Sequence, residues 1–189
     1  MYDTATGTWS TAALSQPRSE LSATSAGGKV FFVGGFASTY SDRVDIYDTV
    51  TDTWTTSTLS QPRRSLKATS IGSKVFFGGG IIGGGVRSNV VDIYDTATGI
   101  WTTAALSLAR YDLSATSAGG KVFFAGGDAS TGYTNRVDIY DLMLRHLLSD
   151  WFNFDYAYDT RPLHRLSVEQ LWPNHRYGLI PPNRWSRRS

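Results

Sequence analysis

Short hydrophobic segments separated by glycine-rich turns occupy most of the first 141 residues, and this pattern predicts strands rather than helices. In one stretch, residues 66–71, 74–77 and 90–94 follow one another, and the second of these is apolar throughout after its lysine and ends near a glycine pair. A fourth, threonine-rich segment is centred on Trp101, after a tight-turn sequence at 95–99. The pattern therefore predicts four short antiparallel strands per unit.

The same four-part unit occurs three times at a spacing of 45 to 47 residues. The sequence Val-Asp-Ile-Tyr-Asp appears at residues 44–48, 91–95 and 137–141, and a clipped copy, Tyr2-Asp3, opens the chain. Trp9 precedes the other repeat tryptophans at the same step. Four strands in a repeat of this length are typical of a propeller blade. The landmarks of the repeat, which we expect to be structural, are Gly34, Gly35, Tyr47, Trp54, Gly79, Gly80, Tyr94, Trp101, Gly126, Gly127 and Tyr140.

A glycine pair after the second strand, a tyrosine in the third and a tryptophan in the fourth resemble the kelch repeat. The alternative blade of similar length would require Trp-Asp late in the unit, whereas Ser10, Thr55 and Thr102 follow the tryptophans here. The resemblance implies an all-β fold of about three four-stranded antiparallel kelch-type β-propeller blades in an incomplete ring.

We expect two regions. Residues 1–141 form the propeller segment, with repeats at about 3–47, 48–94 and 95–141, and residues 142–189 form a basic, irregular, partly helical tail. Propellers close with 4–8 blades, so three blades are too few. Two hypotheses follow. Two copies form a six-bladed homodimer in which each N-terminal strand supplies the partner's missing strand, or the chain is a truncated fragment of a longer kelch protein without autonomous function.

The amino-acid composition excludes several kinds of metal site and cross-link. The 189 residues contain no Cys, carry 18% charged residues and have a net charge of +2. A thiolate metal site, a disulfide and the Cys–Tyr copper chemistry of galactose-oxidase-like propellers are therefore excluded. All three histidines lie in the tail, and the spacing of His164, Glu169 and His175 matches no compact metal motif. We expect no cofactor, metal, membrane or nucleic-acid partner, and favour a cytoplasmic protein because no signal peptide or membrane span is visible.

The repeats differ mainly on one face, which carries the loops between second and third strands and the links between blades. Variable loops on a constant scaffold are typical of recognition surfaces. We predict a non-catalytic interaction scaffold whose protein partner contacts this face, and the residues expected there are Arg18, Glu20, Tyr40, Arg43, Arg63, Arg64, Arg87, Arg110, Tyr111, Asp112, Asp128, Tyr133 and Arg136. One alternative is a carbohydrate-binding or sugar-modifying propeller. Another is that the loop sequences vary only because no function constrains them. The recurring arginines are equally expected to pair with blade carboxylates.

Overall fold

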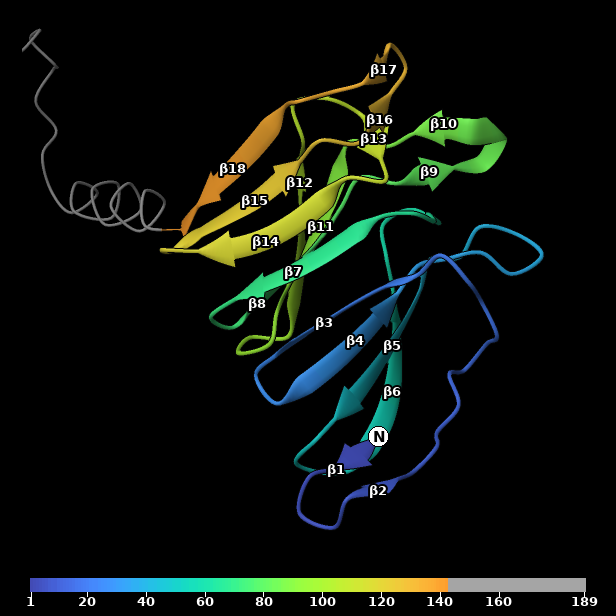
Figure 1. Ribbon diagram of the computed structural model, residues 1–189, viewed down its shortest axis with the longest axis vertical. Coiled ribbons are helices and arrows are strands. Elements are labelled where there is room, and N and C mark those ends of the chain that lie inside the picture. Colours follow the sequence, from blue (N-terminus) through green and yellow to red (C-terminus); the bar gives the residue numbers. More distant parts are fainter. Residues whose placement is uncertain (143–189) are drawn as a thin grey trace, which may run out of the picture. The chain divides into compact units, whose positions relative to one another are not determined.

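The computed structural model describes residues 1–142, which are almost entirely strands and turns (Figure 1). All of them belong to one unit, Met1–Asp150. The predicted tail, with its expected short helix, lies outside the described residues from residue 143 onward. The chain begins with a two-stranded hairpin, made of β1 (Tyr2–Asp3) and β2 (Thr8–Trp9).

Three antiparallel sheets follow, and each is one predicted blade. The first contains β3 (Ser22–Ala26), β4 (Lys29–Val33), β5 (Arg43–Asp48) and β6 (Thr53–Thr58), in that order. The second contains β7 (Lys67–Ile71), β8 (Lys74–Gly78), β11 (Val90–Asp95) and β12 (Ile100–Ala105). The third has three strands, β14 (Ser114–Ala118), β15 (Lys121–Ala125) and β18 (Val137–Asp141). The all-β, blade-forming prediction is confirmed, and so is the incomplete ring.

Short strands also form in the loops and links. The glycine-rich loop of the second blade forms a hairpin of β9 (Ile81–Ile82) and β10 (Val86–Arg87) around a 3-10 turn, Gly83–Gly85. In the third blade, β13 (Arg110–Tyr111) of the link pairs with β16 (Asp128–Ala129), which pairs with β17 (Gly132–Tyr133). The loops are therefore held by backbone hydrogen bonds.

The repeated tyrosine and tryptophan lie opposite each other across the third and fourth strands. Tyr94 is paired with Trp101, and their ring centroids are 4.9 Å apart. Tyr2 and Trp9 have the same register in the N-terminal hairpin, with ring centroids 5.1 Å apart. Because the register is the same, β1 and β2 correspond to the end of a third strand and the start of a fourth strand.

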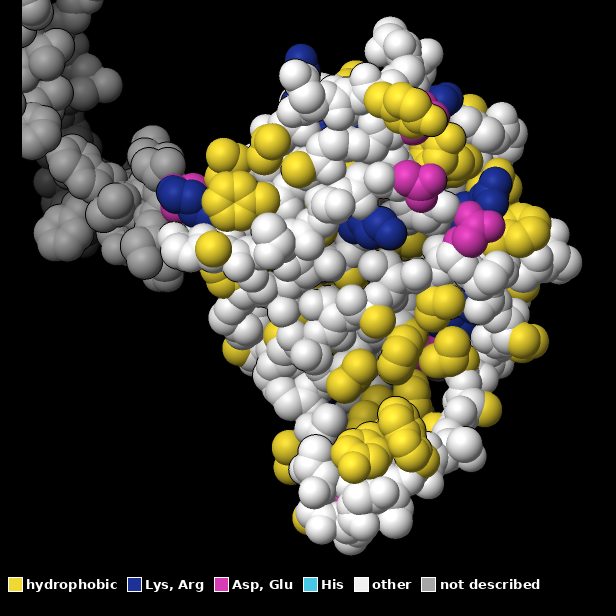
Figure 2. All heavy atoms as spheres, viewed as in Figure 1, with side chains coloured by type: hydrophobic (Ala, Val, Ile, Leu, Met, Phe, Trp, Pro, Cys, Tyr) yellow, Lys and Arg dark blue, Asp and Glu magenta, His cyan; other side chains and the backbone are white. Residues whose placement is uncertain are grey.

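Each blade has two apolar faces, because side chains alternate along its strands. We call the side that meets the preceding blade the leading face; in the first blade it carries Val30, Phe32, Tyr47 and Trp54. The opposite, trailing face carries Phe31, Val44 and Ile46. Figure 2 shows hydrophobic side chains gathered over the first blade and the N-terminal hairpin.

The hydrophobic cores lie between blades. One core combines the trailing face of the first blade with Val75 and Phe77 from the leading face of the second. The other combines Phe76 and Ile93 with Phe124 of the third blade. Fully burying a side chain of this kind contributes about 1.5–3 kcal/mol. A blade is therefore stabilised by its neighbours.

The glycine pair lets successive blades approach closely. Gly79 has φ +69°, and a Cβ there would lie 2.5 Å from the carbonyl oxygen of Arg110 in the link to the third blade. The equivalent position, Gly34, would place a Cβ 2.6 Å from the carbonyl oxygen of Arg63. A side chain at either position would collide with backbone that has little freedom to move, so the pair is structural.

Candidate functional site

The loop face consists of the loops between second and third strands together with the inter-blade links. β9, β10, β13, β16 and β17 gather on this side of the blades (Figure 1). Its residues differ between repeats, and the structure shows how several of them contact one another across neighbouring blades.

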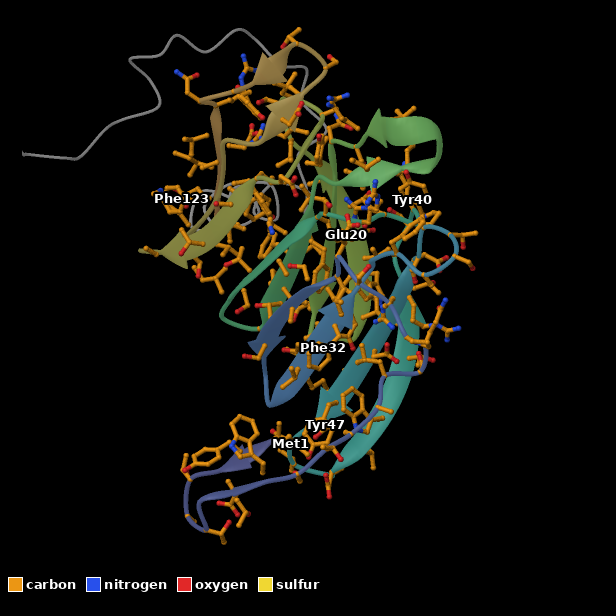
Figure 3. All side chains as sticks on the ribbon, turned by 45° about the vertical axis from the view of Figure 1, so that its right-hand side comes forward. Met1, Glu20, Phe32, Tyr40, Tyr47 and Phe123 are labelled. Carbon is orange, nitrogen blue, oxygen red and sulfur yellow. The ribbon has the colours of Figure 1, made fainter. Side chains whose placement is uncertain are left out.

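The first contact group is centred on Arg64, in the link to the second blade. Its guanidinium donates to both carboxylate oxygens of Glu20, at 2.6 and 2.7 Å. It also lies over the rings of Phe36 and Tyr40, 5.3 and 5.6 Å from their centroids. Figure 3 labels Glu20 and Tyr40, two of the first-blade residues that Arg64 contacts. A hydrogen bond from the Ser65 hydroxyl, with help from Arg64, holds the pKa of Glu20 below its usual range.

The second group joins the next pair of blades. Arg87 of β10 donates to Asp128 Oδ1 at 2.8 Å and lies over the ring of Tyr111, 5.4 Å from its centroid. The hydroxyl of Tyr111 donates to the other oxygen of Asp128 at 3.0 Å. The hydrogen bond from Arg87 lowers the pKa of Asp128, and the same carboxylate raises the pKa of Tyr111. The unlike loops of two blades are thus tied together by complementary charges.

Five loop-face residues remain open to solvent. The side chain of Tyr133, at the end of β17, is 93% exposed, and Val86 of β10 is 56% exposed. Glu20, Asp112 and Arg136 are also in the exposed class, although Glu20 is held by Arg64. Arg136 additionally reaches the hydroxyl of Ser107 at 3.3 Å. Six more of the expected contact residues are half-buried: Tyr40, Arg43, Arg64, Arg87, Tyr111 and Asp128.

The structure corrects the prediction that Arg18, Arg63 and Arg110 face a partner. All three side chains have 0% exposure. Arg18 pairs with Asp45 at 2.6 Å, Arg110 pairs with Asp138 at 2.8 Å, and Arg63 pairs with Asp92. Each carboxylate lies in the third strand of a blade. The alternative expectation, that these arginines pair with blade carboxylates, is confirmed.

The buried arginines also bind backbone carbonyl groups where the second strand ends and the third begins. Arg63 donates to the carbonyl oxygens of Gly79 and Val90, each at 2.7 Å. Arg18 donates to Gly34 O at 2.8 Å, so the glycine pair has the same partner in both blades. A buried charge is tolerated when it is paired with an opposite charge and hydrogen-bonded to the backbone in this way. The arginines therefore fix each link to its own blade.

Sequence reasoning missed the acidic partners, Asp45, Asp92 and Asp138. They were visible as the first aspartate of the Val-Asp-Ile-Tyr-Asp repeat, at nearly constant distance from the recurring arginine. Burial alone would raise the pKa of Asp45, but hydrogen bonds from Ser15 and Arg18 outweigh burial and hold it below its usual range. A constant charge pair within otherwise variable links indicates a structural role.

Residues 1–142 contain no group of three or more His, Asp or Glu side chains placed to hold a metal ion. In the same part of the chain, no helix is long and apolar enough to cross a membrane.

The repeated antiparallel blades, the glycine pairs and the paired Tyr and Trp residues define a β-propeller-like repeat protein. The family model of the Kelch motif matches residues 17–57, which span the first blade. The first blade therefore contains a kelch motif. No curated protein matches its sequence.

Proposed function

We propose that this chain is a non-catalytic scaffold that binds a protein partner through the loop face. The observation that carries the proposal is the exposure of Tyr133, an aromatic side chain that is 93% exposed on a hydrogen-bonded hairpin. Tyrosine is enriched at interface hot spots, where its large ring is buried by a partner. Val86, on the neighbouring hairpin of the second blade, adds apolar area.

The rigidity of the loops supports a binding role. The Arg64 and Arg87 groups each join adjacent blades, so the loops form one continuous surface rather than independent tips. A preorganised surface loses less conformational freedom when it binds. Loop sequences that vary without constraint would also not be expected to form complementary pairs across blades.

The charges of the loop face favour binding over catalysis. The pKa values of Glu20 and Asp128 are lowered and that of Tyr111 is raised, so each shift is away from neutrality. A general acid or base works best with a pKa near the operating pH. The ion pairs on this face also satisfy the carboxylates that a sugar hydrolase would need free.

The experiment places a photo-crosslinking amino acid at position 133 or at position 50. Val50 is 85% exposed and lies in a turn at the opposite end of its blade, so it is a matched control for exposure. Irradiation in a cell extract is expected to give a discrete protein adduct at position 133 and none at position 50.

The captured protein, once purified, is then titrated with the wild type and with Tyr133→Ala. We expect the dissociation constant to rise at least about tenfold in the variant, as for a hot-spot tyrosine. Equal adducts at both positions, or an unchanged dissociation constant, would contradict the proposal. Binding of oligosaccharides without any protein adduct would favour the sugar-binding alternative.

A further inference from the structure

The loops of the first and third blades carry an aromatic residue at the same place on the loop face. In the first blade, Phe36 pairs with Tyr40. In the third blade, Asp128 pairs with Tyr133. Phe36 and Asp128 both directly follow the glycine pair of their repeat. Tyr133 is therefore the third blade's equivalent of Tyr40.

Glu20 and Asp112 are a second pair of equivalent residues. Each lies two residues after the buried arginine of its link. Both have a left-handed backbone, with φ +55° at Glu20 and φ +49° at Asp112. Ser65 has this position in the second blade and the same conformation, with φ +53°. The two carboxyl groups therefore leave the backbone at the same point of the repeat.

In the first blade these two positions bind an arginine side chain. Arg64 donates to both carboxylate oxygens of Glu20, at 2.6 and 2.7 Å, and its guanidinium lies 5.6 Å from the centroid of the Tyr40 ring. Glu20 and Tyr40 are labelled in Figure 3. Bidentate pairing with a carboxylate and a cation–π contact are both interactions that suit the planar guanidinium. The first blade thus shows which side chain this arrangement accepts.

In the third blade the same two positions face solvent. The side chain of Tyr133 is 93% exposed, and Asp112 is also exposed. Within residues 1–142, no cation pairs with Asp112 and none lies over the ring of Tyr133. A carboxylate and a ring that hold a guanidinium in one repeat are therefore unoccupied in another.

The glycine pair of the third blade has an open backbone donor beside these residues. In the first blade, Gly35 N–H donates at 2.8 Å to the carbonyl oxygen of Arg63, the residue before Arg64. The equivalent N–H of Gly127 has no acceptor in the part of the chain that the structure describes. A Cβ on the adjacent Gly126 would have no atom nearer than 3.7 Å, so there is room for another backbone.

An open backbone acceptor lies on the other side of the site. Ser65 N–H donates to the carbonyl oxygen of Glu20 at 3.0 Å, and Asp112 N–H donates to that of Ser65 at 3.3 Å. The carbonyl oxygen of Asp112 is next in this series, and no backbone N–H of residues 1–142 donates to it. The third blade therefore repeats, unoccupied, the groups that bind Arg63, Arg64 and Ser65 in the first blade.

We propose that Asp112 and Tyr133 form the receptor for an arginine side chain of the protein partner. The guanidinium pairs with the Asp112 carboxylate and lies over the Tyr133 ring, while the backbone of the partner bonds to Gly127 N–H and to the carbonyl oxygen of Asp112. A planar fork of donors favours arginine over lysine at such a site. This inference rests on the proposed function, because it names the chemistry that the loop face recognises in its partner.

The probe is a synthetic peptide that copies residues 60–66, because Arg64 of this segment binds the equivalent positions of the first blade. NMR titration of the full chain follows the amide signals of Asp112, Gly127 and Tyr133. We expect these signals to shift and to saturate. A matched peptide with citrulline in place of Arg64 keeps the shape of the side chain but not its charge, and is expected to bind at least about fivefold more weakly.

Variants of the chain separate this site from a general effect of charge. Asp112→Asn is expected to raise the dissociation constant of the peptide at least about fivefold. Asp112→Glu places the side chain of Glu20 at the equivalent position and is expected to preserve binding. Asp42→Asn is the matched control, because Asp42 is also an exposed carboxylate of the loop face, and is expected to bind the peptide as the wild type does.

Absence of saturable shifts at the three amides, equal binding of the citrulline peptide, or equal effects of Asp112→Asn and Asp42→Asn would overturn the proposal. The titration does not use the captured protein, so its outcome is independent of the crosslink at position 133. A protein adduct at position 133 together with a peptide that does not bind would remove the arginine site and leave the proposed function in place. A bound peptide without any protein adduct would overturn the proposed function instead.

Discussion

The guanidinium of Arg63 forms an ion pair with Asp92, and both side chains are almost completely buried. Arg63 belongs to the link that enters the second blade, and Asp92 belongs to the third strand of that blade. Burial lowers the pKa of Arg63, and the charge of Asp92 opposes this shift. The pair repeats in all three blades, so it acts as a common attachment of link to blade.

Removal of one partner of this pair is expected to be strongly destabilising. Arg63→Ala would leave a buried carboxylate without its counter-charge, which typically costs about 3–5 kcal/mol of unfolding free energy. The adjacent Arg64→Ala removes a partly exposed ion pair, and exposed pairs contribute about 0–1 kcal/mol. Urea denaturation of the two variants measures both changes. Equal losses of stability would contradict the assignment of Arg63 to the fold and Arg64 to the surface.

Gly79→Ala is expected to weaken the contact between the second and third blades. The new methyl group would lie 2.5 Å from the Arg110 carbonyl oxygen, and the residue keeps φ +69°. We expect a loss of about 2–4 kcal/mol, which combines backbone strain with a collision in the core. Gly84→Ala is the control, because Gly84 has φ +73° but nothing within 4 Å of a new Cβ.

The difference in thermal midpoint between the two glycine variants isolates the collision from the strain. If Gly84→Ala lowered the midpoint as much as Gly79→Ala, close approach of the blades would not explain the glycine pair.

Ion pairs at the hairpin corners predict a loss of stability in acid. Lys29 pairs with Asp48 and Lys74 with Asp95, and these hydrogen bonds lower the pKa of each carboxyl to about 2. An unfolded Asp has a pKa of about 3.9. Their contribution is therefore present above about pH 4 and is lost as the pH falls through about 2.

Urea midpoints of the wild type and Asp95→Asn, measured between pH 7 and pH 2, test this dependence. The variant is expected to be less stable at pH 7 and to lose less stability below pH 4, because one titrating carboxyl has been removed. Asp112→Asn, at an exposed link residue, serves as the control and is expected to follow the wild type. If the urea midpoint fell equally below pH 4 in Asp95→Asn and in the wild type, the role of the Lys74 pair would be contradicted.

The blades could be predicted because their signals are local. The run Val75-Phe76-Phe77 alternates between the two faces of one blade, and both faces are buried in the middle of the series. Tyr94 and Trp101 fall opposite each other because the turn between their strands has a fixed length. Such features depend on neighbouring residues and repeat with the unit.

The loop face could be predicted only in part, because its contacts join different repeats. Arg64 and Arg63 are adjacent in the sequence, yet one lies over Phe36 at the surface and the other is buried. The backbone turns sharply at Ser65, which has φ +53°. A serine in the sequence does not predict this left-handed conformation. The pairing of Arg87 with Asp128 depends on two unlike loops, so no single repeat contains it.

Hydrogen exchange across the second and third blades tests most directly whether a blade is stabilised by its neighbours. The second blade contributes to both hydrophobic cores, through Phe77 on one face and Phe76 on the other. The account predicts that the amides of β8 and β11 exchange more slowly than those of Val137 and Ile139 in β18, whose side chains are 50% and 58% exposed. Equal or faster exchange in β8 and β11 would contradict it.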